Sequence, residues 1–311
     1  MTITFIGGTG AMGLIFGSRL AKQGYSVVLF DVNKESVSAV NSRGAKITNH
    51  MGEMETITNL RATGDPYEVG DSELVFLFTK CYWTAGALAL AEPFIGKNST
   101  VVSLQNGWGN YDQIREYIDP QRILVGVNYI SGTTLAPGHA KQAGQPSAVL
   151  GKVGATANDF SREVAALLTR SGIHTEVSDK ILDQIFAKLA LNAATLAPSA
   201  LLHLEAHQLL EQDMTVQLMD SILEEVVAVA KTQGVILDYA ETRNRIHDVL
   251  RNAVGAKSSM LQDVEAKRQT EIDVINGAIV RMGALAGIPT LINEQMVSLI
   301  KAKEKTYLIT I

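Results

Sequence analysis

Glycines close to the N-terminus follow a spacing that suits the binding of phosphate groups. The run Gly8-Thr9-Gly10-Ala11-Met12-Gly13 comes directly after the apolar segment Ile3–Ile6 and opens a helical pattern, Leu14–Gln23. In such a loop one glycine permits a tight turn, the next lets backbone N–H groups approach a pyrophosphate, and the third lets the helix pack on the strand. The positive end of the helix dipole then faces the phosphates. We therefore expect a dinucleotide to bind at Gly8, Thr9, Gly10, Ala11, Met12 and Gly13.

An acidic residue stands where such a site needs one. A second apolar run, Val27–Phe30, ends at Asp31. About 20 residues beyond the glycines, a carboxylate accepts hydrogen bonds from the ribose hydroxyls of NAD, whereas its charge repels the 2′-phosphate of NADP. No arginine follows immediately, although Lys34, Arg43 and Lys80 are candidate counter-charges. The sequence predicts a preference for NAD(H), with NADP(H) as the alternative.

A stripe of polar residues follows one face of a long apolar helix that begins near Asp179. Its members are spaced four, four, three and four residues apart: Gln184, Lys188, Asn192, Thr195 and Ser199. The stripe is either the solvent face of the helix or a functional face that points Lys188 into a cleft. In a cleft, the ammonium group could polarise a carbonyl and supply a proton.

An acidic residue downstream is the candidate partner of this lysine. Glu271 shares the expected helix face of Val274, Ile275 and Ala278, so its side chain would lean inward. The alternative is a surface ion pair with Lys267, four residues earlier.

These features together resemble the ketopantoate reductase (2-dehydropantoate 2-reductase) family over nearly the whole chain. The most specific match is Ser-Met-Leu-Gln-Asp followed by Arg-Gln-Thr-Glu-Ile-Asp and Asn-Gly, within Ser258–Gly277. The other matches are the glycine loop, Thr79-Lys80, Leu104–Gly107, Pro137-Gly138, and Lys188 with Asn192.

The resemblance implies roles for particular residues and a pathway, pantothenate biosynthesis. Lys188 looks like the general acid and Glu271 like its acidic partner, while Lys80 resembles a cofactor-side lysine. Asn106 resembles a residue beside the nicotinamide ribose and the substrate, and Asn192 and Ser259 resemble substrate contacts, Ser259 near the carboxylate. The implied reaction moves a hydride to C2 of a 2-oxo acid and gives an R (D) hydroxyl. Family members are often homodimers with a substrate cleft between two domains.

Two departures from the family keep the substrate open. Many members carry an asparagine eight residues after the lysine, where this chain has Leu196, and the biosynthetic enzymes usually favour NADPH, unlike a chain with Asp31. Both changes fit NAD-dependent D-2-hydroxyacid dehydrogenases that act on branched or aromatic 2-oxo acids. Further alternatives are an opine-type, imine-reducing dehydrogenase and a dinucleotide-sensing protein without catalysis.

The sequence pattern of the elements that must position these residues changes once along the chain. Up to Ser178, short β-branched runs alternate with helical patterns, which predicts a Rossmann-type α/β domain with a mainly parallel sheet. Within it, Asn128–Gly144 is expected to form an antiparallel excursion on the sheet edge. From Asp179 the strand signal fades, which predicts an all-helical domain. The family resemblance implies that this domain serves substrate binding and dimerisation. The expected domains are residues 1–178 and 179–311.

Composition narrows the class of protein. The 311 residues carry a net charge of −5 and no basic stretch, which argues against a nucleic-acid partner. One cysteine, no signal-like segment and no long uninterrupted apolar run predict a cytoplasmic protein that does not span a membrane. His203 and His207 have metal-ligand spacing, but no third ligand is evident, so we expect no metal site.

Overall fold

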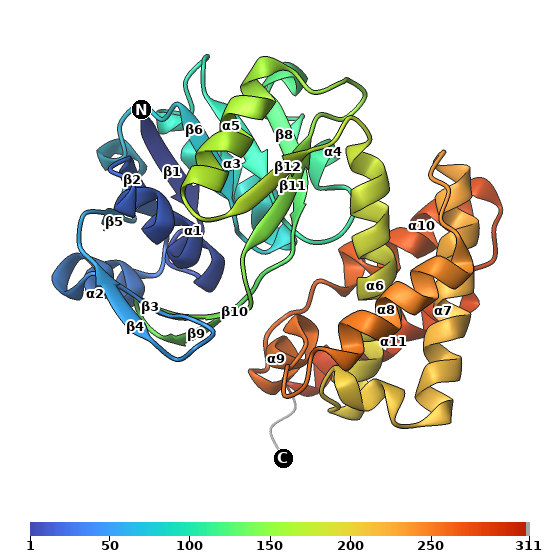
Figure 1. Ribbon diagram of the computed structural model, residues 1–311. Coiled ribbons are helices and arrows are strands. Elements are labelled where there is room, and N and C mark those ends of the chain that lie inside the picture. The colour runs from blue at the N-terminus through green and yellow to red at the C-terminus, as the bar shows by residue number, and fades with distance from the viewer. Residues whose placement is uncertain (309–311) are drawn as a thin grey trace. The chain divides into compact units, whose positions relative to one another are not determined.

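The computed structural model describes residues 1–308 and divides into two compact units (Figure 1). Unit 1 comprises Met1–Gln105 and Asn110–Ile181, and unit 2 comprises Asn106–Gly109 and the chain from Leu182 onward. The division at Ile181 falls three residues after the boundary expected from the sequence. The transfer of Asn106–Gly109 to unit 2 was not expected, because a four-residue segment leaves no mark in a sequence pattern.

The main sheet of unit 1 has eight strands in the order β12-β11-β8-β7-β6-β1-β2-β5. Its neighbouring strands are parallel except for the antiparallel pair β8 and β11. The strands are β1 (Thr2–Ile6), β2 (Ser26–Phe30), β5 (Arg61–Thr63), β6 (Leu74–Leu77), β7 (Thr100–Ser103), β8 (Ile123–Asn128), β11 (Ser147–Gly151) and β12 (His174–Val177). The mainly parallel Rossmann-type sheet is thus as predicted.

The central strands are buried along nearly their whole length, as expected of parallel strands covered on both faces. Phe5 on β1 stacks on Phe76 of β6, with ring centroids 4.9 Å apart, and Phe78 stacks beside both rings. These aromatic contacts fix the middle of the sheet, where the glycine loop begins.

The segment Asn128–Gly144 corrects one expectation. It contains an antiparallel hairpin, but the hairpin belongs to a second sheet of order β4-β3-β10-β9 rather than to the edge of the main sheet. The strands of this sheet are β3 (Ala45–Thr48), β4 (Met54–Ile57), β9 (Ser131–Ala136) and β10 (His139–Ala143). Segments about ninety residues apart in sequence therefore lie side by side (Figure 1). The parallel pairing of β3 with β10 could not be read from local pattern.

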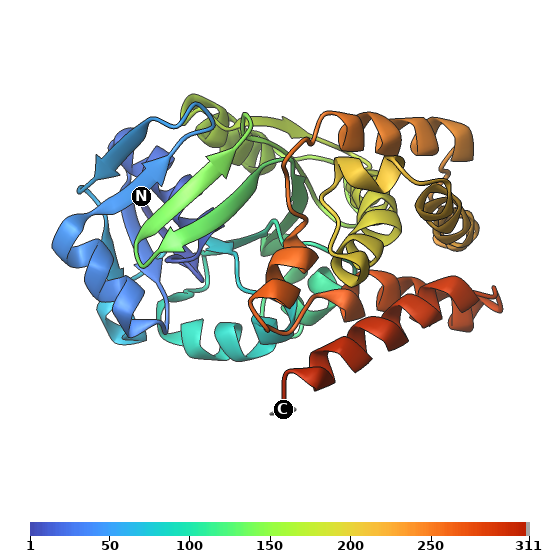
Figure 2. The same ribbon diagram turned by 90° about the horizontal axis from the view of Figure 1, so that it is seen from below.

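Helices accompany the sheets of unit 1 and build unit 2. Those of unit 1 are α1 (Ala11–Lys22), α2 (Lys34–Arg43), α3 (Thr84–Ala91), α4 (Asn110–Ile114) and α5 (Asp159–Arg170), with 3₁₀ helices η1 (Pro66–Glu68), η2 (Cys81–Trp83), η3 (Glu92–Phe94) and η4 (Pro120–Arg122). The α6 helix (Ile181–Leu202) leads into unit 2, which continues with η5 (His207–Leu210), α7 (Asp213–Thr232), α8 (Tyr239–Arg251), α9 (Ser259–Glu265), η6 (Ile272–Val274), α10 (Asn276–Ala286) and α11 (Leu291–Thr306). Figure 2 shows α11 as the red helix that leads to the C-terminal end.

The core of unit 2 forms around α6. Phe186, Leu189, Ala193 and Ala197 of this helix lie in one apolar cluster with residues of α7, α8, α9, α10 and α11. By length and composition alone α6 could cross a membrane, but 67% of its most apolar window is buried inside the structure. It also carries Lys188, so we regard it as the core helix of a folded domain.

Candidate active site

The glycine loop of unit 1 fits a dinucleotide because two of its glycines cannot carry a side chain. A Cβ atom on Gly8 would lie 2.6 Å from the Phe5 carbonyl oxygen, and one on Gly13 would lie 2.5 Å from the Gly8 carbonyl oxygen. The absence of side chains at Gly8 and Gly13 therefore lets the loop pack closely against β1 and α1, as the glycine spacing predicted. Gly10 is more open, since a Cβ there would meet only the Gly7 carbonyl oxygen, at 3.3 Å.

The N-terminus of α1 is suited to an anion. Gly10 is its N-cap residue and offers no side-chain acceptor, and the first turn contains no acidic residue. The first N–H groups of this twelve-residue helix therefore have no side-chain cap, and the first turn itself adds no negative charge. Together with the close packing of Gly8 and Gly13, this matches what the pyrophosphate of a dinucleotide requires.

Asp31 follows β2 and points its carboxylate toward the glycine loop. Its Oδ2 accepts a hydrogen bond from the Thr9 backbone N–H (3.0 Å), and its Oδ1 accepts one from the Asn33 N–H (3.1 Å). The side chain is therefore held in place beside the loop before any ribose binds. The contact with Thr9 could not be predicted from the spacing of the two residues.

The loops after β6 and β7 are joined at the carboxyl ends of these strands. Gln105 donates from Nε2 to the Thr79 carbonyl oxygen (2.8 Å) and to the Thr84 hydroxyl (2.9 Å). Lys80, half-buried, lies between these two threonines as the N-cap residue of η2. Ligands of open α/β sheets bind at this edge, so the position of Lys80 is compatible with its expected role.

The polar stripe on α6 is not a solvent face. Asn192, Thr195 and Ser199 are 8%, 4% and 0% exposed, while Lys188 is half-buried. The Thr195 hydroxyl donates back to the Leu191 carbonyl oxygen (2.7 Å), which satisfies it within the helix. Of the two interpretations of the stripe, solvent exposure is wrong for these residues.

Lys188 is electrostatically perturbed. Burial lowers the pKa of its ammonium group from 10.5 to about 8, and the carboxylate of Glu271 acts in the opposite direction. Desolvation disfavours the charged form, whereas a nearby negative charge favours it. A lysine that titrates near neutral pH can exchange a proton in either direction, as a general acid or base must.

Glu271 reaches this lysine from a loop and not from a helix, which corrects the expected helix face. Glu271 precedes η6, and α10 begins only at Asn276. The side chain is 8% exposed, so the surface pair with Lys267 is also wrong; Lys267 is exposed and takes a left-handed conformation, with φ of 52°. Glu304 of α11 holds the preceding residue, Thr270, by accepting hydrogen bonds from its N–H (2.8 Å) and its hydroxyl (2.7 Å).

Asn106 lies in the short segment that belongs to unit 2. The neighbouring Trp108 donates its backbone N–H to the Val274 carbonyl oxygen (2.8 Å), and its ring packs on Phe186 of α6 at 4.6 Å between centroids. A Cβ on Gly107, whose φ is +85°, would lie 2.5 Å from the same Val274 oxygen. Trp108 therefore joins the segment of Asn106 both to η6, which follows Glu271, and to the helix of Lys188.

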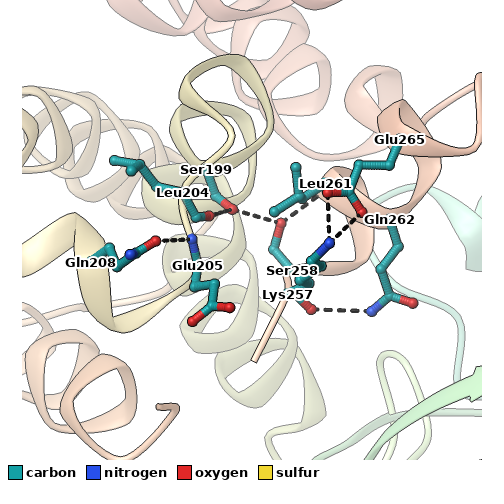
Figure 3. Close-up of polar contacts among 9 residues, drawn as sticks. All are labelled: Ser199, Leu204, Glu205, Gln208, Lys257, Ser258, Leu261, Gln262 and Glu265. Carbon is teal, nitrogen blue, oxygen red and sulfur yellow. Dashed lines mark hydrogen bonds and ion pairs between the residues drawn. The ribbon is translucent and has the colours of Figure 1, made fainter. Parts of the chain in front are cut away.

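Ser259 is the first residue of α9 and is exposed. The preceding Ser258 is the N-cap: its hydroxyl accepts from the Leu261 N–H (3.1 Å) and is hydrogen-bonded to the Ser199 hydroxyl (3.0 Å) (Figure 3). Ser199 also donates to the Leu204 carbonyl oxygen (2.7 Å), beyond the end of α6. The end of the stripe thus fixes the start of the helix that presents Ser259.

The structure brings five of the predicted residues to unit 2 and the others to unit 1. Unit 2 holds Asn106, Lys188, Asn192, Ser259 and Glu271, and unit 1 holds Gly8–Gly13, Asp31 and Lys80. The sequence pattern assigned no role to Ser258, Thr270, Glu304 or Trp108. Only Ser258, which precedes Ser259 at a helix start, carried a sequence signal, that of an N-cap. In the described chain, no three His, Cys, Asp or Glu side chains cluster as metal ligands would.

Comparisons with known proteins cover both units. Residues 4–155 match the family model "Ketopantoate reductase PanE/ApbA", and residues 180–304 match "Ketopantoate reductase PanE/ApbA C terminal". The chain is 32% identical over 301 residues to a 2-dehydropantoate 2-reductase of Pyrococcus abyssi, covering 96% of this chain and 97% of that protein. It is 30% identical over 303 residues to that of Streptococcus pyogenes, covering 97% and 98%.

Solved structures agree with this. A ternary structure of D-mandelate dehydrogenase with NADH and anilino(oxo)acetate superposes with a TM-score of 0.94 at 28% identity, covering 99% of this chain and 100% of that one. A PanE/ApbA family ketopantoate reductase from Ralstonia eutropha gives 0.91 at 29% identity, with the same coverage.

The Rossmann fold and the polar residues of the helical unit define an NAD(P)H-dependent oxidoreductase. Both family models match, and together they span most of the sequence. The chain belongs to the ketopantoate reductase family.

Proposed function

We propose that this enzyme reduces the C2 carbonyl of a 2-oxo acid to an R-configured hydroxyl, with 2-dehydropantoate as the first candidate substrate. The observation that carries the proposal is Lys188: a desolvated lysine on the polar stripe of α6, with the carboxylate of Glu271 acting on it. Desolvating an ammonium group costs free energy, so a lysine at this place is expected to serve chemistry rather than packing. A protein that only senses dinucleotides has no need of it.

The residues of unit 2 supply the proton and hold the substrate. A nicotinamide dinucleotide, when bound, would supply the hydride to C2. Lys188 donates a proton to the carbonyl oxygen, so the carbonyl becomes a hydroxyl and the lysine becomes neutral. Glu271 favours the ammonium form before transfer. Asn192 and Asn106 offer amide groups to the substrate, and Ser259 offers its exposed hydroxyl to the carboxylate. In unit 1 the N-terminus of α1 holds the pyrophosphate.

A second candidate, an NADH-linked dehydrogenase of branched or aromatic D-2-hydroxy acids, is favoured by Leu196. This residue is buried in the apolar cluster of unit 2, where many family members offer an amide. A site without that amide loses a partner for a substrate hydroxyl and gains apolar surface, which favours less polar side chains. The similarity to D-mandelate dehydrogenase supports the same candidate.

The deciding experiment follows NADH or NADPH oxidation with 2-dehydropantoate and a panel of branched and aromatic 2-oxo acids. The second candidate requires a higher kcat/KM for an aromatic or branched acid than for 2-dehydropantoate, and the reverse order supports the first. Turnover that depends on an added amine would instead indicate an imine reductase. The absence of turnover with every 2-oxo acid would contradict the proposal.

We expect kcat/KM for NADH to exceed that for NADPH by at least about tenfold, because the fixed carboxylate of Asp31 repels a 2′-phosphate. Asp31→Ser should narrow this ratio, raising kcat/KM for NADPH and lowering it for NADH through loss of the contact with Thr9. Steady-state kinetics with both cofactors measure the ratio. Glu35→Gln, which removes an exposed carboxylate four residues later, is the matched control and should leave the ratio unchanged. A wild-type enzyme that prefers NADPH would refute the assignment of Asp31.

We also infer that the protein is soluble, cytoplasmic and homodimeric. The mostly buried α6 supports solubility. Sedimentation of the purified protein tests the dimer, and localisation of a tagged chain tests the compartment.

A further inference from the structure

Asn276 is a buried amide in the apolar core of unit 2. It is the first residue of α10 and is 0% exposed, between Ile275 and Ala278 of the core cluster. Its Nδ2 donates two hydrogen bonds, one to the Ala193 carbonyl oxygen of α6 (3.0 Å) and one to Oδ1 of Asn293 on α11 (2.9 Å). These two contacts connect α6, α10 and α11 and offset part of the cost of burying the amide, whose Oδ1 has no hydrogen-bond partner in the described structure.

A carboxylate fixes the direction of this amide. Glu225 of α7 accepts from the backbone N–H groups of Ile292 and Asn293 (both 2.9 Å) and from Asn293 Nδ2 (2.7 Å). An ionised carboxylate can only accept hydrogen bonds, so Asn293 must turn its NH₂ group toward Glu225 and its Oδ1 toward Asn276. Asn276 must then present its own NH₂ group, which faces Ala193. These hydrogen bonds link α7 to α6 through Asn293 and Asn276, with Asn276 as the donor on both sides.

The two ends of the contact between Asn276 and Ala193 lie beside the catalytic candidates. Ala193 follows Asn192 and stands five residues after Lys188, and Asn276 stands five residues after Glu271. The two residues are 83 positions apart in the chain. Pro198, later in the same helix, has no N–H and cannot donate to the carbonyl of Ala194, the residue after Ala193.

We propose that Asn276, oriented by Glu225 through Asn293, is a positioning residue that sets the register between the helix of Lys188 and the loop of Glu271. The proposal rests on the function proposed above for Lys188. Asn276 touches neither substrate nor cofactor in this role; it keeps the ammonium and the carboxylate at the separation that the proton transfer requires. Small displacements of such groups lower the rate steeply.

The test compares Asn276→Ala and Glu225→Gln with Thr215→Val. For Asn276→Ala we expect kcat to fall about 10- to 100-fold while the Kd for NADH stays within about twofold, since the glycine loop, Asp31 and Lys80 all belong to unit 1. The alkaline limb of the kcat profile should move to lower pH, on the order of one unit, because a displaced Glu271 stabilises the ammonium form of Lys188 less. Glu225 is remote from the site. Glu225→Gln should also lower kcat and move the alkaline limb of the kcat profile to lower pH, in each case by less than Asn276→Ala does.

Thr215→Val is the matched control for a loss of stability. It removes another buried hydrogen bond of unit 2, from the Thr215 hydroxyl to the Leu209 carbonyl oxygen (2.6 Å), without touching α6 or the loop of Glu271. Thr215→Val should lower Tm but leave both kcat and the alkaline limb of the kcat profile unchanged. If Asn276→Ala behaves like this control, the positioning role is refuted. If Lys188→Ala retains activity, the proposed function itself fails, so the two failures are distinguishable.

Discussion

Lys188→Ala is expected to lower kcat for 2-oxo acid reduction by about 10²- to 10⁴-fold, the range that a positioned general acid contributes. Binding of NADH should be nearly unchanged, because the glycine loop, Asp31 and Lys80 all belong to unit 1. Stopped-flow or steady-state assays give kcat, and titration of NADH fluorescence gives the Kd.

Lys180→Ala is the matched control for this variant. Lys180 is exposed and stands immediately before α6, so its removal changes the charge equally without touching the buried stripe. Its kcat should match that of the wild-type enzyme. Wild-type turnover in Lys188→Ala would remove the lysine from the mechanism and leave the proton donor unassigned.

The stability of a Lys188 variant separates loss of chemistry from loss of fold. The pKa is lowered from 10.5 to about 8, so keeping the folded protein protonated at pH 7 costs about 3 kcal/mol relative to the unfolded chain. Lys188→Met removes this cost while retaining an apolar side chain, and its Tm at pH 7 should exceed that of the wild-type protein. Between about pH 8 and 10.5 the unfolded chain binds more protons, so the wild-type stability rises with pH and the difference shrinks. A variant that is inactive and less stable at pH 7 would point to misfolding instead.

For the wild-type enzyme, the rate of 2-oxo acid reduction should fall as the pH rises through about 8, because the donor must be protonated. Oxidation of the 2-hydroxy acid needs the neutral amine and should rise through the same pH. Glu271→Gln removes the negative charge that favours the ammonium form, so the pKa of Lys188 should fall further. At pH 8 we expect reduction to slow by about tenfold or more, with both profiles displaced to lower pH.

The pH profiles measured in both directions test this assignment. Glu241→Gln removes an exposed carboxylate in the first turn of α8 and should leave the profiles in place. Profiles of Glu271→Gln that coincide with the wild-type curves would show that this carboxylate does not act on the proton donor. A displacement to higher pH would contradict the electrostatic argument directly.

Local patterns predicted much of the first unit. The strand before the glycine loop, the loop itself and the strand before Asp31 are contiguous, so their chemistry is readable along about 30 residues. The hairpin of β9 and β10 was also recognisable, from its turn at Pro137-Gly138. Its partner was not, because β3 lies about ninety residues earlier and strand pairing across that distance depends on how α1 packs between the two sheets.

The candidate site shows the same limit. Spacing along α6 identified a stripe that includes Lys188, but it could not decide whether the stripe faces solvent, because burial depends on which helices cover it. Glu271 was expected on a helix, because the apolar residues Val274, Ile275 and Ala278 follow it at helical spacing. Helix α9 ends at Glu265, and Thr270 donates hydrogen bonds to Glu304 of α11. A contact from another helix therefore overrides the local pattern.

The sequence by itself determined the class of fold, the dinucleotide loop, the acidic residue beside it and the family resemblance, because each depends on residues close together in the chain or on matched motifs. Tertiary structure alone decided which polar groups are buried and which hydrogen bonds hold them. The examples are the hydrogen bonds between Asp31 and Thr9, between Trp108 and Val274, and between Asn276 and Ala193. The reason is physical. The pKa of Lys188 and the orientation of each amide are set by neighbours in space, and those neighbours come from segments that only folding brings together.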